Sequence, residues 1–243
     1  IQHEKIAKDF ANYLELYYKY QKDYEIDAIL GGHIKESLCD KLAKAPFDER
    51  LGVMNLLLEK LNGCFGQLYR KEERLTRLMQ LFKGMKPDTG EEDLYDSPLE
   101  HLEGIAAGAR AEWKYKRESG LLGRREDHLY QDTGRILEDT IQRIKAEQLH
   151  TREQVWEKIE ETFEEKNKEY ESLFEDCGRW LEHGFDFMEA AFGDSQEMVV
   201  FVTGLNTGFY SVKFLQEYLC ERYYQYNERL LFDNQEKEIL SRI

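Results

Sequence analysis

Residues 151–192 constrain the fold more than any other part of the chain. They include no proline, and their apolar residues recur at steps of three, four or seven: Val155, Ile159, Phe163, Tyr170, Phe174, Cys177, Leu181, Phe185, Met188 and Phe192. This spacing places them in one stripe along an α-helix. Such a helix would be roughly 60 Å long at 1.5 Å per residue. Because its stripe must pack against other helices, the segment predicts a bundle built around one long helix.

The rest of the chain also favours helices. Only three prolines occur in 243 residues and none follows Pro98, which suits long helices and not a sheet with many turns. Helical spacing predicts further helices over residues 2–23, 24–43, 47–82, 97–120, 124–148, 195–229 and 234–242. The stripe of 47–82 ends with Leu75, Met79 and Phe82. We therefore predict an all-α fold, an elongated multi-helix bundle of six to eight helices with one long central helix.

Two helix starts carry specific signals. Ser97 precedes Pro98 and stands three residues before Glu100, which combines an N-cap serine, a first-turn proline and a capping glutamate. Thr151 and Gln154 form the same kind of capping box at the start of the long helix. These signals predict that one helix begins at residue 97 or 98 and another at 151 or 152.

One segment breaks every helical pattern. Residues 84–96, GMKPDTGEEDLYD, combine glycine, proline and acidic residues. We predict an N-terminal helical subdomain over residues 1–83, a linker or excursion over 84–96, and a C-terminal helical bundle over 97–243. The chain begins with Ile1, and we expect it to be a fragment of a larger chain.

The charge and the cysteines limit the possible functions. The formal net charge is −15, which argues against binding a nucleic-acid backbone or an anionic membrane surface. The longest apolar run, residues 198–202, is far shorter than the ~20 residues of a membrane span. The four cysteines are scattered and form no C-x-x-C pair: Cys39, Cys64, Cys177 and Cys220. Buried free thiols in a reducing cytoplasm are the prediction.

Residues 199–210, VVFVTGLNTGFY, imitate a dinucleotide-binding fold, with a β-branched run, a glycine loop and then a helix. The third glycine of that motif is missing, because Tyr210 stands in its place, and too few residues follow for a parallel sheet. Asp194 and Glu197 form a capping box just before the run. We therefore predict a helix here.

No motif supports catalysis. Glu147 and His150 give only half of a carboxylate-bridged di-metal motif, which needs two such pairs. The chain has no phosphate-binding Gly-Lys sequence and no G-x-S-x-G elbow. We name no catalytic residue, no metal ligand and no cofactor. The alternative is an enzyme or ligand-binding domain with a metal or nucleotide site in the bundle core.

Basic residues concentrate in one place on this acidic chain. Six lie within 16 residues that contain only two acids: Arg110, Lys114, Lys116, Arg117, Arg124 and Arg125. This basic cluster could bind an acidic peptide or a phosphate. In the alternative interpretation, some of these cations stabilise a helix C-terminus and the others face water.

Tyrosine is in excess, with 15 residues. The tyrosines near the C-terminus, Tyr210, Tyr218, Tyr223, Tyr224 and Tyr226, occupy more than one helix face, so some rings should be exposed as in protein interfaces. We predict a contact surface that includes Tyr218, Arg222, Tyr224 and Arg229. Packing of Tyr224 on a neighbouring helix of the same chain is the alternative.

Residues 192–239, in particular AFGDSQEMVVFVTGL and YNERLLFDNQEKEI, resemble the helical tail that follows the ATPase module in some large bacterial AAA+-type proteins. The resemblance covers about a fifth of the chain. It implies a module accessory to an ATPase and gives no functional residues. The predicted function is a non-enzymatic helical scaffold or protein-interaction module, whose partner is another protein or a domain of the parent chain.

Overall fold

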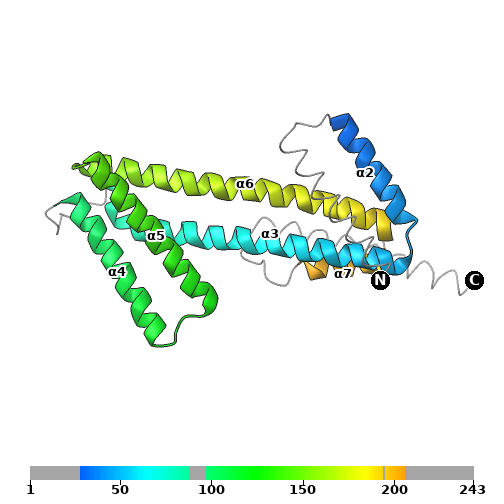
Figure 1. Cartoon of the computed structure of the whole chain (residues 1–243), viewed down its shortest axis with the longest axis horizontal. Helices are drawn as coiled ribbons and strands as arrows, with labels where there is room; N and C mark the ends of the chain where they lie inside the picture. The colour runs from blue at the N-terminus through cyan, green and yellow to red at the C-terminus, as the bar shows by residue number, and fades with distance from the viewer. Residues whose placement is uncertain (1–27, 88–96, 194, 206–243) are drawn as a thin grey trace, which may run out of the picture. The chain divides into compact units, whose positions relative to one another are not determined.

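The computed structural model describes residues 28–87, 97–193 and 195–205. Within these ranges the regular secondary structure is α-helical, apart from one short 3-10 helix, and contains no strand (Figure 1). The elements are α2 (Ala28–Ala43), α3 (Phe47–Phe82), η1 (Lys83–Met85), α4 (Pro98–Glu118), α5 (Arg124–Glu147), α6 (Arg152–Phe192) and α7 (Gln196–Gly204). The predicted all-α bundle is confirmed. The longest of the described helices is α6, with 41 residues.

The helix ends follow from the sequence. The Ser97 hydroxyl accepts a hydrogen bond from the backbone N–H of Glu100 at 3.2 Å, and α4 begins at Pro98 as predicted. At the start of α6, the Gln154 N–H donates to the Thr151 hydroxyl at 3.3 Å. The Gln154 side-chain oxygen in turn accepts from the Thr151 N–H at 3.2 Å, which completes the predicted capping box.

Residues 196–204 form α7, so the β-branched run at Val199 is helical and the rejection of a nucleotide-binding strand is confirmed. The remaining predicted helices, at residues 2–23 and beyond residue 205, lie outside the described residues.

The chain divides into two compact units. The first comprises Ile1–Gln67 and Glu175–Ile243, and the second comprises Leu68–Phe174. Helices α3 and α6 contribute residues to both units, so these boundaries differ from the predicted subdomains of residues 1–83 and 97–243. In the second unit, α4 and α5 lie side by side and are joined by a short connection (Figure 1).

The second unit has its own apolar core. Buried side chains from the end of α3, from η1, α4 and α5, and from the start of α6 pack in one cluster: Leu78, Phe82, Met85, Leu102, Leu137, Ile141, Ile144, Val155 and Ile159. Leu78 is 0% exposed, whereas its neighbour Met79 is 58% exposed. The predicted stripe through Met79 is therefore wrong by one residue at this point.

The first unit is built around α3, α6 and α7. Its core includes Leu61 and Phe65 of α3, and Cys177, Leu181, Phe185 and Met188 of α6, as the stripe of the long helix predicts. The Phe185 and Phe201 rings meet edge to face, with 5.5 Å between their centroids. Gly184 permits this packing, because a Cβ there would lie 3.2 Å from a methyl group of Leu61. No described helix has the length and apolar character needed to cross a membrane.

Candidate functional site

A groove of about 420 Å³ on the second unit is the candidate functional site. Its lining comes from the end of α3, the residue after η1, and the first half of α6: Met79, Phe82, Lys86, Trp156, Ile159, Glu160, Phe163 and Glu164. Phe82 and Ile159 are each 2% exposed and close its floor. Met79, Lys86, Glu160 and Glu164 are exposed and stand at its edges. The groove therefore combines an apolar floor with a charged rim.

The spacing along each helix creates this surface. Trp156, Glu160 and Phe163 follow one another at steps of four and three on α6, so they lie on one face of the helix. Met79 and Phe82 have the same relation on α3. On each of the two helices, an apolar residue of the groove directly follows a core residue. Met79 follows Leu78 on α3, and Trp156 follows Val155, which is 0% exposed, on α6. Neighbouring residues on a helix point about 100° apart, so the second residue of each pair faces away from the core.

Trp156 is held in the groove by two charged neighbours. Its indole N–H donates to a carboxylate oxygen of Glu160 at 2.7 Å. The Lys86 ammonium lies over the ring, 5.9 Å from its centroid, within the range of a cation–π contact. The indole is therefore fixed in orientation and only partly buried, which leaves an ordered aromatic surface for a ligand.

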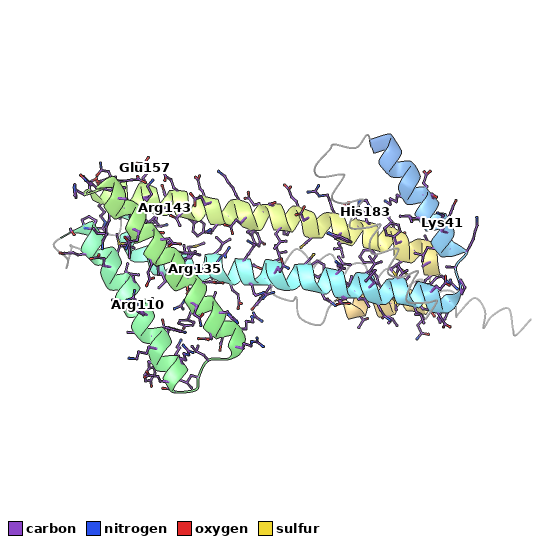
Figure 2. The ribbon with its side chains drawn as sticks, viewed as in Figure 1. Lys41, Arg110, Arg135, Arg143, Glu157 and His183 are labelled. Atoms are coloured by element: carbon purple, nitrogen blue, oxygen red, sulfur yellow. The ribbon has the colours of Figure 1, made fainter. Side chains whose placement is uncertain are left out.

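The basic cluster lies on α4 and at the start of α5, and the structure pairs most of its members within the chain. Arg110 forms an ion pair with Glu138 of α5. Lys114 lies 3.9 Å from Glu118. The Arg117 guanidinium lies over the Trp113 ring, 5.3 Å from the centroid. Figure 2 shows Arg110 on α4 and Arg135 on α5 of the same hairpin.

Arg125 bonds a carboxylate oxygen of Glu73 at 2.8 Å and covers the Tyr69 ring at 3.8 Å. Arg124 is exposed at the first position of α5. These intramolecular pairs favour the interpretation in which the cluster stabilises the fold, because paired cations attract a phosphate or an acidic peptide less strongly. Binding of such a ligand by the basic cluster stays a prediction.

Lys116 belongs to the best-connected polar group of the second unit. Its ammonium donates to Glu112 at 2.7 Å, and Glu112 also accepts from Tyr130 at 2.7 Å and from Arg77 at 3.2 Å. The Arg77 guanidinium lies 3.6 Å from the centroid of the Tyr130 ring. The Lys116 hydrogen bond, together with those from Tyr130 and Arg77, lowers the pKa of Glu112 to about 2. These side chains connect α3, α4 and α5 through hydrogen bonds to one another, so they do not form an open binding site.

A second groove, of about 360 Å³, lies between α4 and α5 and includes Ala106, Trp113, Tyr130 and Gly134 in its lining. Trp113 donates from its indole N–H to Asp127 at 2.7 Å. Ala106 is the one lining residue of this groove that is buried, whereas Phe82 and Ile159 are both buried in the groove around Trp156. Arg110, Arg135 and Glu138 are exposed residues of its lining.

The predicted contact surface of Tyr218, Arg222, Tyr224 and Arg229 lies outside the described residues. Among the described residues, no group of three or more His, Cys, Asp or Glu side chains is arranged to bind a metal ion. The prediction of an enzymatic site in the bundle core is untested.

Comparison with known proteins identifies no relative. The sequence matches no protein-family model, and no curated protein or solved structure matches it. The resemblance of residues 192–239 to the tail of AAA+-type proteins stays a prediction.

Sequence reasoning missed the groove around Trp156, although one signal pointed to it. The pairs Leu78–Met79 and Val155–Trp156 each place two apolar residues about 100° apart on a helix, so one residue of each pair can lie at the edge of the buried face. Only the structure shows that Met79 and Trp156 line one groove.

Proposed function

We propose that this chain is a protein-interaction module that binds an amphipathic helix of a partner protein in the groove around Trp156. The observation that supports it most directly is the 58% exposure of Met79, in the same groove as a fixed and partly buried Trp156. A contiguous exposed apolar patch rimmed by polar residues marks an interaction site or a ligand-binding groove. A helix packed into an apolar groove is a recurrent mode of peptide recognition.

Two of the three charged residues on the rim are carboxylates, and they define the charge of the partner. Glu160 and Glu164 are exposed and lie one turn apart on α6. A partner helix with two Lys or Arg residues one turn apart can place them opposite these carboxylates. The net charge of −15 attracts a basic segment over longer distances as well. We therefore assign a basic amphipathic helix to the groove, with Leu, Ile or Met anchors on its apolar side.

The burial of Met79 determines how much a substitution at this position should weaken binding of the partner helix. Full burial of a methionine side chain is worth about 1.5–3 kcal/mol, so covering the exposed part of Met79 should contribute about 1–1.5 kcal/mol. Loss of that contribution raises the dissociation constant roughly tenfold.

The test uses an 18-residue fluorescent peptide with leucines at helical spacing on one side and lysines on the other. Met79→Ser should weaken its binding roughly tenfold in fluorescence anisotropy. Leu121→Ser is the matched control, because Leu121 is 63% exposed and lies outside the groove; it should bind like the original chain. Equal weakening by both substitutions, or by neither, would exclude the groove as the binding site.

Two further measurements check the mode of binding. A variant with Trp113→Phe and Trp180→Phe keeps Trp156 as its single tryptophan, so its fluorescence should change when the peptide binds. A second peptide, with every lysine replaced by glutamate, should bind at least tenfold more weakly. Equal affinity for the two peptides would refute the role of Glu160 and Glu164.

The proposed association with an ATPase rests on the resemblance of residues 192–239 alone. It is supported if the parent reading frame encodes a Walker A and a Walker B motif beside this chain, and it fails if no such module is present.

A further inference from the structure

Three basic side chains converge on one carboxylate where α3 contacts α6 in the second unit. The Lys71 ammonium and the Nη2 atom of Arg74, both on α3, each lie 3.0 Å from Oε2 of Glu169 on α6. The Lys166 ammonium lies 2.6 Å from Oε1 of the same carboxylate. Three positive charges therefore face a single negative charge. We call these four side chains the Glu169 cluster.

The acids beside Lys71 in the sequence do not balance this excess. Glu73 forms its ion pair with Arg125 of α5. The Oε2 atom of Glu72 is buried and accepts no hydrogen bond within the described part of the chain. The arrangement differs from that of the basic cluster on α4 and α5, where Arg110 and Arg125 each bind a carboxylate of their own.

The cations of the Glu169 cluster are largely buried. The exposed fraction of the side chain is 16% for Arg74, 25% for Lys166 and 26% for Lys71. Water and salt screen such charges less than they screen charges on an open surface. Lys71 and Arg74 contact the same oxygen, so their charges lie close together and repel each other. Buried charges are normally balanced by partners of opposite sign, and this cluster has too few.

The electrostatic field at Glu169 reflects the excess. Partial burial alone would raise the pKa of this carboxyl, but hydrogen bonds from Lys166 and Lys71 lower it to about 2. The position occupied by the Glu169 carboxylate therefore favours negative charge strongly.

Arg74 also has a donor that Glu169 does not use. Its Nη2 donates to Glu169, whereas its Nε is buried and has no hydrogen-bond partner among the described residues. These two nitrogens lie on one edge of the planar guanidinium, and such an edge binds two oxygens of a phosphate in parallel. An oxyanion at the position of the Glu169 carboxylate can thus satisfy both nitrogens and still offer oxygens to Lys71 and Lys166.

We propose that the Glu169 cluster is a binding site for the phosphate group of a small phosphorylated ligand, and that Glu169 occupies this site when no ligand is bound. The Glu169 side chain is 40% exposed, so it can turn into water when the phosphate enters. A phosphate monoester carries about two negative charges near neutral pH, where the carboxylate carries one. The exchange brings the charge of the site closer to balance.

The first experiment titrates the full chain with inorganic phosphate in a calorimeter. It is done at about pH 7.5, where phosphate is mostly the dianion, and at constant ionic strength set with sodium chloride. We expect saturable binding at one site. Glu169→Gln should bind phosphate roughly tenfold more tightly, because the competing carboxylate is gone while the three cations stay. No saturable binding by the Glu169→Gln chain would overturn the proposal.

Two variants locate the site. Arg74→Gln should weaken phosphate binding at least tenfold, because it removes the charged edge with two donors. Arg135→Gln is the matched control: Arg135 is 71% exposed and pairs with Asp132 on its own helix, so binding should be unchanged. If Arg74→Gln loses the helical circular dichroism spectrum, Lys71→Gln replaces it and should weaken binding in the same way. Equal weakening by the control variant would show that phosphate binds elsewhere.

A last comparison identifies what carries the phosphate group. O-phosphoserine should bind about as tightly as inorganic phosphate, and a short peptide with one phosphoserine should bind no more tightly than O-phosphoserine. Tighter binding of the peptide would overturn the assignment to a small molecule and would assign the site to a phosphorylated protein.

Discussion

Replacement of Leu78 and of Met79, one at a time, separates the stability of the second unit from its surface. Leu78 is 0% exposed and packs in the core with Phe82, Leu102 and Leu137. Leucine-to-alanine substitutions in cores cost about 2–5 kcal/mol, and more when the surrounding side chains cannot close the cavity. Because several helices and η1 hold this core, we expect Leu78→Ala to lower the free energy of unfolding by about 3–4 kcal/mol.

Met79→Ala should have a much smaller effect. With 58% of the side chain already exposed, the substitution removes less than half of the burial energy of a methionine, about 0.6–1.2 kcal/mol. Alanine also favours the helix slightly more than methionine does, which offsets part of this loss. We expect a change below about 1 kcal/mol, and therefore a difference of at least about 2 kcal/mol between the two variants.

Urea denaturation followed by far-UV circular dichroism measures both values, with the slope of each transition checked for a change in the unfolding mechanism. Both variants should keep the circular dichroism spectrum of the original chain in the absence of urea. Equal losses for the two residues, or a greater loss for Met79, would show that α3 presents another face to the core and would remove the basis for the groove.

Two further predictions concern charge and packing. Glu112 has a folded-state pKa of about 2, below its ordinary value, so its contribution to stability is complete above pH ~5 and disappears as pH falls toward 2. Glu112→Gln should therefore lose less stability than the original chain over that pH range, as measured by thermal unfolding; parallel curves would contradict the assignment. Gly184→Ala should be less stable than Gly108→Ala by about 1–3 kcal/mol, because a Cβ at Gly184 crowds Leu61 at 3.2 Å, whereas a Cβ at Gly108 meets nothing within 4 Å. Equal stability of the two glycine variants would show that the core yields at Gly184.

The sequence predicted local structure well, because the determinants are local. The Ser97 cap, the Thr151 capping box and the helical state of Val199 depend on residues within one or two turns. The stripe of α6 was also predictable, since a 41-residue helix repeats its apolar spacing many times. One residue that departs from the apolar spacing does not change the prediction for a helix of this length.

The identity of the buried residue at the end of α3 was not predictable in the same way. Leu78 and Met79 both fit a broad apolar stripe, and the choice between them depends on where α4, α5 and α6 pack. The groove has the same origin, since it joins residues of α3 with residues of α6 that are far apart in the chain. Helical spacing describes each face separately and does not show which faces meet.

The basic cluster illustrates the same limit for charge. Within its 16 residues the cations outnumber the acids, and this local excess suggested a binding site. The carboxylates that pair with Arg110 and Arg125 are Glu138 and Glu73, which lie outside that window. A count of neighbouring charges in the sequence therefore overestimates how available these cations are.

The division into two units fixes the order in which the protein can be completed during synthesis. The second unit is one continuous segment, Leu68–Phe174, whereas the first needs both Ile1–Gln67 and Glu175–Ile243. On the ribosome the apolar residues of the first half of α3 emerge early, and their partners on α6 and α7 emerge only after the whole second unit. At a synthesis rate of about 5–20 residues per second, that interval is roughly 5–20 s. During this time Leu61 and Leu58 lack their native neighbours, Gly184 of α6 and Gly204 of α7, so the nascent chain has an interval in which a chaperone can bind them.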